Sequence, residues 1–116
     1  MEVTHLILSH LIHNEGYART TLPYLESKYF TENAERIVYE QIDEFISKYN
    51  SLPTREALTI ELDTRKGISE KEFSECGQYI GTLIVDERED SDWLVNTTEK
   101  FCQEKALYNA IMDSIA

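Results

Sequence analysis

The sequence predicts an all-α fold, with a compact head of about five to six helices followed by one long C-terminal helix. Apolar residues recur at spacings of three and four, whereas strict alternation is hard to find. Helix caps such as Ser69-Glu72 and stop signals such as Asn50 and Pro53 separate the apolar stripes. With 116 residues, 41% of them apolar, the chain can form one domain with a buried core, but not two.

The first helix is predicted near residues 3–12 and is apolar around most of its circumference, which fits a central helix packed on several sides. Its apolar residues are Val3, Leu6, Ile7, Leu8, Leu11 and Ile12. Gly16 interrupts this pattern. The stretch 17–30, which contains Pro23, predicts short helical pieces that wrap the core through Tyr24, Leu25, Tyr29 and Phe30.

The clearest amphipathic helix is predicted over residues 34–49. Thr31 is expected to cap its start, and Asn50 can adopt the left-handed conformation that ends a helix. Pro53 prevents its continuation. Polar residues such as Glu35 and Glu40 fill one face. The other face carries Ala34, Ile37, Val38, Gln41, Ile42, Phe45, Ile46 and Tyr49.

Two shorter helices follow. The first is expected to begin after Thr54 and stop at Gly67, with Lys66 in its last turn. The second opens with a capping box at Ser69-Glu72 and turns Phe73, Cys76, Ile80, Leu83 and Ile84 inward. Gly77 and Gly81 lie four residues apart in it, which indicates either the close approach of a neighbouring helix or a tolerated weakness.

An acidic linker at residues 86–92 leads into a long helix that runs to the end of the chain. Leu94, Phe101, Tyr108 and Ile115 are seven residues apart, which is the spacing of one heptad position. This stripe predicts packing along another helix, in the same chain or in a partner, or an ordinary amphipathic helix on its own domain. Trp93 is either a partner contact or a cap on the core.

The end of the long helix carries no stop signal. It has no terminal glycine, no basic last turn and no following proline, and Asp113 is unfavourable near a helix C-terminus. We therefore expect the chain to be the N-terminal fragment of a longer protein.

The charge balance argues against nucleic-acid binding by this chain. Asp and Glu number 22 against 11 Lys and Arg, so the net charge is −11, which should repel a phosphate backbone. Cys76 and Cys102 have no disulfide or metal-ligand spacing and are expected to be buried free thiols. No signal peptide or apolar run of about 20 residues is visible, so we expect a soluble, cytoplasmic protein without a membrane partner.

The sequence contains no recognisable catalytic motif. It has no GxxxxGK[ST] phosphate loop, no GxSxG and no HExxH, so ATP hydrolysis by this chain is not expected. His10 and His13 lie three residues apart, and with Glu15 they could be drawn as a metal site. Packed histidines explain them better, so we predict no metal, no cofactor and no catalytic residue.

Several stretches taken together resemble the N-terminal domain of DnaB-family replicative helicases, in particular the T-even phage type that works with a separate primase. The resemblance covers essentially the whole chain and rests on the order and spacing of apolar patterns. These are the opening 6–12, Tyr29-Phe30 before Ile37-Val38-Tyr39, Leu52-Pro53-Thr54 before Leu58 and Leu62, and Trp93-Leu94-Val95 leading through Phe101 into Lys105-Ala106-Leu107-Tyr108.

The resemblance implies a helical head at 1–90 and, at 91–116, the first arm of a helical hairpin that leads to a missing ATPase domain with its ATP and Mg²⁺. Such N-terminal domains associate from dimers to a hexameric ring, form a collar and help to recruit primase or a helicase loader. The expected location is the cytoplasm of an infected bacterial cell. The implied hairpin or subunit interface comprises Leu94, Phe101, Tyr108, Ile111 and Ile115, with Trp93 as a possible partner contact.

Two alternatives remain open at the level of the sequence. A self-contained acidic helical phage protein could mimic DNA or inhibit a host nucleic-acid enzyme, and a net charge of −11 suits that function. Such a protein needs no further chain, whereas a collar must continue into an ATPase domain. A helical metalloenzyme built on His10 and His13 would require bound metal after purification.

Overall fold

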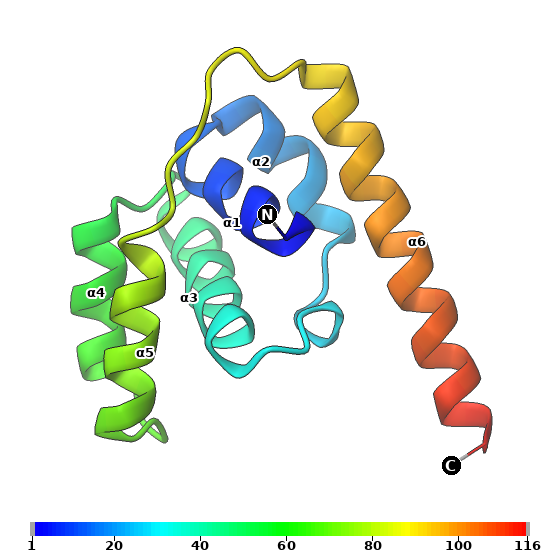
Figure 1. Cartoon of the computed structure of the whole chain (residues 1–116). Coiled ribbons are helices and arrows are strands. Elements are labelled where there is room, and N and C mark those ends of the chain that lie inside the picture. The colour runs from blue at the N-terminus through cyan, green and yellow to red at the C-terminus, as the bar shows by residue number, and fades with distance from the viewer. Residues whose placement is uncertain (1, 116) are drawn as a thin grey trace.

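The computed structural model describes residues 2–115, which form α-helices and short 3₁₀-helices and contain no strand (Figure 1). The predicted all-α class is confirmed. The elements are α1 (Val3–His13), α2 (Glu15–Thr21), η1 (Leu22–Tyr24), η2 (Ser27–Tyr29), α3 (Asn33–Tyr49), α4 (Arg55–Thr64), α5 (Glu70–Ile80) and α6 (Ser91–Ile115).

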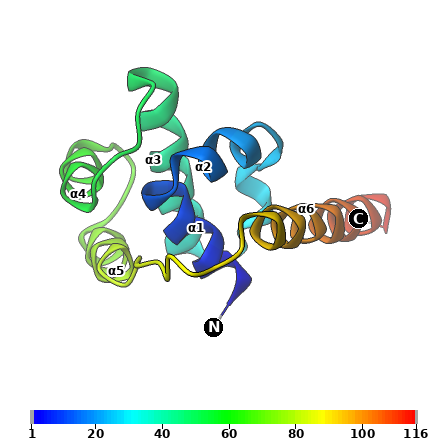
Figure 2. The same cartoon turned by 90° about the horizontal axis from the view of Figure 1, so that it is seen from above.

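The head is built around α1. Every residue from Ile7 to Ile12 is buried, as expected for a helix that is packed on several sides. Helices α2, α3 and α6 all contact α1, while α4 and α5 pack on each other and on α3 (Figure 2). The head therefore has one core, with α1 at its centre.

The chain between α1 and α3 wraps this core in short helical pieces, as predicted. The break falls at Asn14, whose side chain accepts a hydrogen bond from the Tyr17 backbone N–H at 3.1 Å, so Gly16 lies inside the first turn of α2. Leu25, Tyr29 and Phe30 are buried, and Tyr24 is half-buried. The ring of Phe30 stacks on Tyr39 of α3 with 4.7 Å between centroids.

Helix α3 has the predicted C-terminus and a different N-terminus. Asn50 caps the end in the left-handed conformation, with φ 52° and ψ 36°. The expected Thr31 cap is wrong, because Glu32 occupies the N-cap position without a side-chain cap hydrogen bond. Within the helix, Glu35 is buried although the sequence places it on the polar face.

Helices α4 and α5 start where the sequence predicts. The Thr54 side chain accepts from the Ala57 N–H at 3.0 Å, and the Ser69–Glu72 capping box is formed in both directions. Helix α4 ends at Thr64 rather than at Gly67, so Lys66 lies in the turn and not in the last helical turn. Gly67 supplies the turn with a φ of 86°.

The expectations for the end of α5 are partly wrong. Leu83 is buried, but Ile84 is 67% exposed, because the helix stops at Ile80 and its periodicity no longer applies. A Cβ atom on Gly77 would meet nothing within 4 Å, and one on Gly81 would meet only backbone oxygens of its own turn. Neither glycine marks the close approach of another helix.

Helix α6 leaves the head on the side away from α4 and α5. Both views show its first half lying against the head and its second half projecting beyond it (Figures 1 and 2). The radius of gyration is 14.2 Å, slightly above the ~13 Å typical of a compact chain of this length. The projecting half of α6 accounts for this excess.

A candidate interaction surface on the projecting helix

The predicted interface residues on α6 fall into two groups. Leu94 is 1% exposed and Phe101 is half-buried, so both pack within the head of their own chain. Tyr108, Ile111 and Ile115 are more than half exposed. The heptad stripe therefore starts as a contact with the head and ends as a free surface.

The first half of α6 is fixed to the head by buried side chains about one turn apart, Leu94, Thr98 and Cys102. The Thr98 hydroxyl is hydrogen-bonded to the Tyr17 hydroxyl of α2, and the bond is buried. Phe101 lies against Phe30, with 5.8 Å between ring centroids. Burial raises the pKa of the Cys102 thiol to about 11, so the thiol is neutral at physiological pH.

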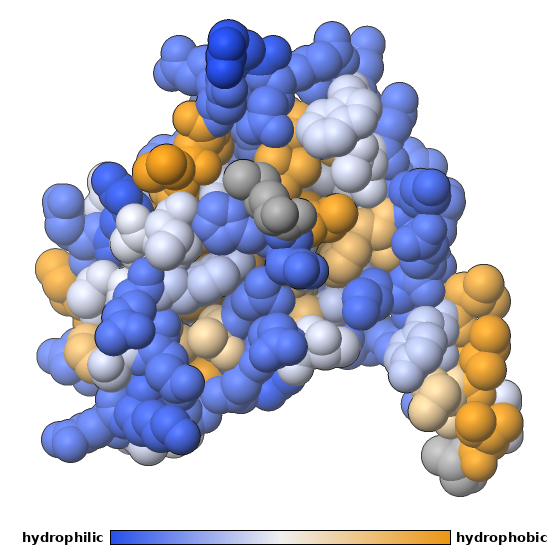
Figure 3. Space-filling view, viewed as in Figure 1, coloured by the Kyte–Doolittle hydropathy of each residue, from blue (hydrophilic) through white to orange (hydrophobic). Residues whose placement is uncertain are grey.

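The second half of α6 carries a row of uncovered apolar side chains, which we call the distal face. Their exposed fractions range from 43% to 71%, and their spacings of one, three and four residues place them on one side of the helix. Figure 3 shows this end of α6 as an apolar projection from a largely polar molecule. The distal face consists of Leu107, Tyr108, Ile111, Met112 and Ile115.

The geometry of a straight α-helix explains why the heptad residues diverge. An α-helix drifts by about 20° per heptad relative to a seven-residue repeat. Three heptads separate Leu94 from Ile115, so the stripe turns away from the head by about 60° along α6. The distal face thus points sideways from the line of contact with the head, and the half of α6 that carries it projects beyond the head (Figure 1).

Trp93 lies on the same side of α6 as the distal face. It is 18 residues before Ile111, which is about five helical turns. Its side chain is 50% exposed, so the core does not enclose the indole. Thr97, Lys100 and Glu104 lie between the tryptophan and the distal face on this side, so the apolar surface is not continuous.

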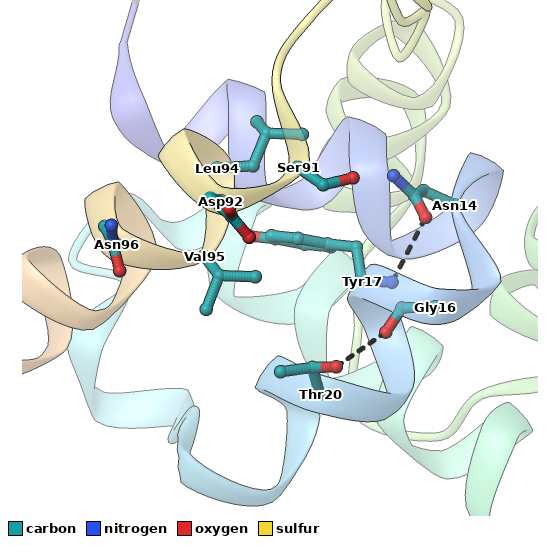
Figure 4. Close-up of a pocket in the computed structure, with 9 residues that line it drawn as sticks. All are labelled: Asn14, Gly16, Tyr17, Thr20, Ser91, Asp92, Leu94, Val95 and Asn96. Atoms are coloured by element: carbon teal, nitrogen blue, oxygen red, sulfur yellow. Dashed lines mark hydrogen bonds between the residues drawn. The ribbon is translucent and has the colours of Figure 1, made fainter.

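A hollow of about 550 Å³ lies between α2 and the start of α6, and nothing in the sequence signals it (Figure 4). The Asn14 side chain accepts a hydrogen bond from the Tyr17 backbone N–H, and the Thr20 hydroxyl donates one to the Gly16 carbonyl. Asp92 is the one carboxylate in the lining, and no histidine, cysteine or lysine accompanies it. The hydroxyls of Tyr17 and Thr20 bond to Thr98 and Gly16 rather than to Asp92, so they are not paired with it as nucleophile and base. The lining consists of Asn14, Gly16, Tyr17, Thr20, Ser91, Asp92, Leu94, Val95 and Asn96.

The three histidines of α1 bond to the segment that connects α5 to α6. His5 Nε2 lies 3.0 Å from the Thr82 carbonyl oxygen, and His13 Nε2 lies 2.8 Å from that of Leu83. His10 is buried, with its Nε2 2.8 Å from a Glu89 carboxylate oxygen. Within residues 2–115, no group of three or more His, Cys, Asp or Glu side chains is placed to hold a metal ion. The histidines therefore position the connecting segment.

No helix in the described part of the chain is both long and apolar enough to cross a membrane. Helix α6 has the length, but charged and polar residues interrupt its apolar positions.

Comparison with known proteins finds a similarity that covers nearly the whole chain. No family model matches the sequence. Over 108 residues, or 93% of its length, the chain is 34% identical to a DnaB-like replicative helicase of Enterobacteria phage T4. It spans 22% of the length of that helicase. The resemblance to DnaB-family replicative helicases is thereby confirmed, and the chain is a relative of a phage DnaB-like helicase along nearly all of its own residues.

Proposed function

We propose that this chain is the collar and assembly domain of a phage replicative helicase, and that the distal face of α6 packs against a companion helix. Of the two companions that the resemblance implies, we propose the α6 helix of a neighbouring subunit rather than the second arm of a helical hairpin, because the chain itself can supply that companion. The exposed row of apolar side chains on a projecting helix carries the proposal. ATP hydrolysis, with ATP and Mg²⁺, belongs in this proposal to a separate domain of the helicase.

The energetics of self-association through this face are close to balanced. Covering the exposed half of one large apolar side chain gives on the order of 1 kcal/mol. A symmetric pair of chains covers the five residues of the distal face twice. The sum is on the order of 10 kcal/mol, within the range of ~4–15 kcal/mol that association costs in lost freedom. We therefore expect pairing that depends on protein concentration.

The strong acidity supports a collar that avoids DNA and binds basic proteins. A net charge of −11 repels phosphate and speeds encounter with positively charged surfaces, such as those we propose on a primase or helicase loader. The same acidity would suit a DNA mimic, but similarity to a replicative helicase supports the collar.

Sedimentation velocity over a range of concentrations tests the proposed packing. The wild-type chain should shift towards a larger species as concentration rises, and Ile111→Glu should remain monomeric because a charge on the distal face opposes burial. Ala106→Glu is the matched control, since Ala106 is exposed on the opposite side of the same half of α6. A wild-type chain that is monomeric throughout, or equal effects of both substitutions, would contradict the proposal.

A further inference from the structure

A second hollow lies on a different surface, between α1 and the segment that connects α5 to α6. Its volume is about 340 Å³. Residues of α1 form one wall, and residues 84–89 of the connecting segment form the other. The lining consists of His5, Leu6, Ser9, Ile84, Val85, Asp86 and Glu89.

Two polar groups in this lining have unused hydrogen-bonding capacity. Ser9 is 1% exposed, and its Oγ has no hydrogen-bond partner, which is unusual for a buried hydroxyl. Glu89 uses Oε1 to bind the buried His10, which orients the carboxylate and leaves Oε2 for another donor. Both residues line the hollow.

The remaining walls define the chemistry of that ligand. Leu6, Ile84 and Val85 are apolar, and Ile84 is 67% exposed. Asp86 adds a second carboxylate, although it is engaged with Arg88 at 2.7 Å. No lysine or arginine lines the hollow, and the basic partners of its two carboxylates, Arg88 and His10, lie outside the lining. A ligand with an apolar stem and a cationic, multiply donating head fits these walls.

We propose that this hollow binds an arginine side chain of a partner protein. The alkyl stem packs on Leu6, Ile84 and Val85, and the guanidinium donates to Glu89 Oε2 and Ser9 Oγ. Arginine suits the site better than lysine because its planar head carries several donors in a fixed fork that reaches two acceptors together. The site lies apart from the distal face of α6, so arginine binding at this hollow can be tested separately from the proposed self-association.

An NMR titration of the ¹⁵N-labelled chain with acetyl-arginine-methylamide tests the site directly. Saturable amide shifts should concentrate at Leu6, Ser9, Val85 and Glu89. Acetyl-citrulline-methylamide has nearly the same shape without the charge, and it should bind at least about tenfold more weakly. The absence of saturable shifts at these residues, or equal binding of the two probes, would overturn the proposal.

Matched variants separate a built site from general attraction to an acidic protein. Glu89→Gln should weaken binding of the arginine probe about tenfold while keeping an acceptor for His10. Glu87→Gln removes the same charge from the same segment outside the lining and should leave binding unchanged. Ser9→Ala should weaken binding without loss of thermal stability, because its hydroxyl has no partner in the fold. Equal effects of the two glutamine substitutions would show only non-specific charge attraction.

Discussion

Asn50 shows how a single residue sets the end of a helix. Its left-handed backbone conformation stops α3, and its side-chain oxygen accepts a hydrogen bond from Arg19 Nη1 at 3.1 Å. The backbone carbonyl of Asn50 accepts a second bond from Arg19, at 3.2 Å. The α3 terminus is thereby joined to α2.

Replacing Asn50 with alanine should destabilise the fold by about 1 kcal/mol, because a Cβ-bearing residue without a local polar partner is strained at positive φ. Asn50→Gly should stay within about 0.5 kcal/mol of wild type, since glycine adopts this conformation freely and the lost hydrogen bond is exposed. Urea denaturation followed by circular dichroism measures both. If both variants lost the same free energy of unfolding, the stabilisation would come from the Arg19 contact and not from the backbone conformation of Asn50.

Glu40 links α3 to η2 and to Arg65, which follows the last residue of α4. Burial alone would raise the pKa of its carboxyl, but hydrogen bonds from Ser27 and Arg65 outweigh burial and hold the pKa below its ordinary value. The ionised carboxylate therefore stabilises the folded chain above about pH 4.3, the ordinary pKa of a glutamate. That contribution is lost as pH falls through the lowered pKa.

The stability difference between wild type and Glu40→Gln should accordingly be largest near neutral pH and shrink below about pH 4. Urea denaturation at several pH values measures this difference. In an Arg65→Gln background the same substitution should have a smaller effect, because the main cationic partner is absent. A difference that does not change with pH would contradict this role of the ionised carboxylate.

Glu35 is the residue that helical periodicity describes least well. Its carboxylate is buried and accepts hydrogen bonds from the Thr4 hydroxyl at 2.6 Å and the Tyr79 hydroxyl at 3.2 Å. Burial and the neighbouring carboxylate raise the pKa of Tyr79 far above its usual value, so that hydroxyl stays protonated and donates. The two donors come from α1 and α5, so the pattern of α3 alone could not indicate them.

At the scale of elements, local signals predicted helix starts and stops where a residue type has a specific capping role, through its side chain or through a left-handed backbone conformation. Thr54, Ser69-Glu72 and Asn50 act as their types suggest. Thr31 was the wrong choice because Glu32 takes the cap position with its backbone conformation alone. The end of α4 at Thr64 was also not predicted. Arg65 and Lys66 lie in the turn before Gly67, but both are residue types that are common in helices.

The attachment of α6 to the head depends on a buried pair that the sequence does not reveal. Thr98 donates to the Leu94 carbonyl at 2.8 Å, so its hydroxyl is left to accept from the Tyr17 hydroxyl. Thr98→Val keeps the shape but leaves the Tyr17 hydroxyl buried without a partner, which should cost about 1–3 kcal/mol.

Thr97→Val is the control for this substitution. Thr97 is half-buried and one residue earlier on α6, so the change should stay within about 0.5 kcal/mol of wild type. Urea denaturation followed by Trp93 fluorescence reports on α6 itself. Equal stabilities of the Thr98 and Thr97 variants would contradict the importance of the Tyr17–Thr98 bond.

At the scale of the whole molecule, the heptad spacing predicted apolar contacts along α6 but not which partner each residue meets. The head is large enough to cover Leu94 and, in part, Phe101, and it ends before Tyr108. Where the head ends depends on how α2 and η2 fold beneath α6, and no local pattern encodes that. The exposure of the second half of α6 therefore could not be predicted from the sequence.

The similarity to a DnaB-like helicase supports a function for the exposed second half of α6. A projecting helix with apolar residues on one side is costly for an isolated domain, because it favours unspecific association. In the subunit assembly proposed above, a neighbouring α6 would cover the same face. The proposed collar function therefore requires the distal face to be a contact surface.

Amide hydrogen exchange measured across protein concentration tests this claim most directly. Protection of residues 107–115 should rise with concentration in wild type and stay low in Ile111→Glu, while residues 94–102, already packed on the head, should be equally protected in both at every concentration. Protection of residues 107–115 that is independent of concentration, or that rises equally in Ile111→Glu, would contradict the account.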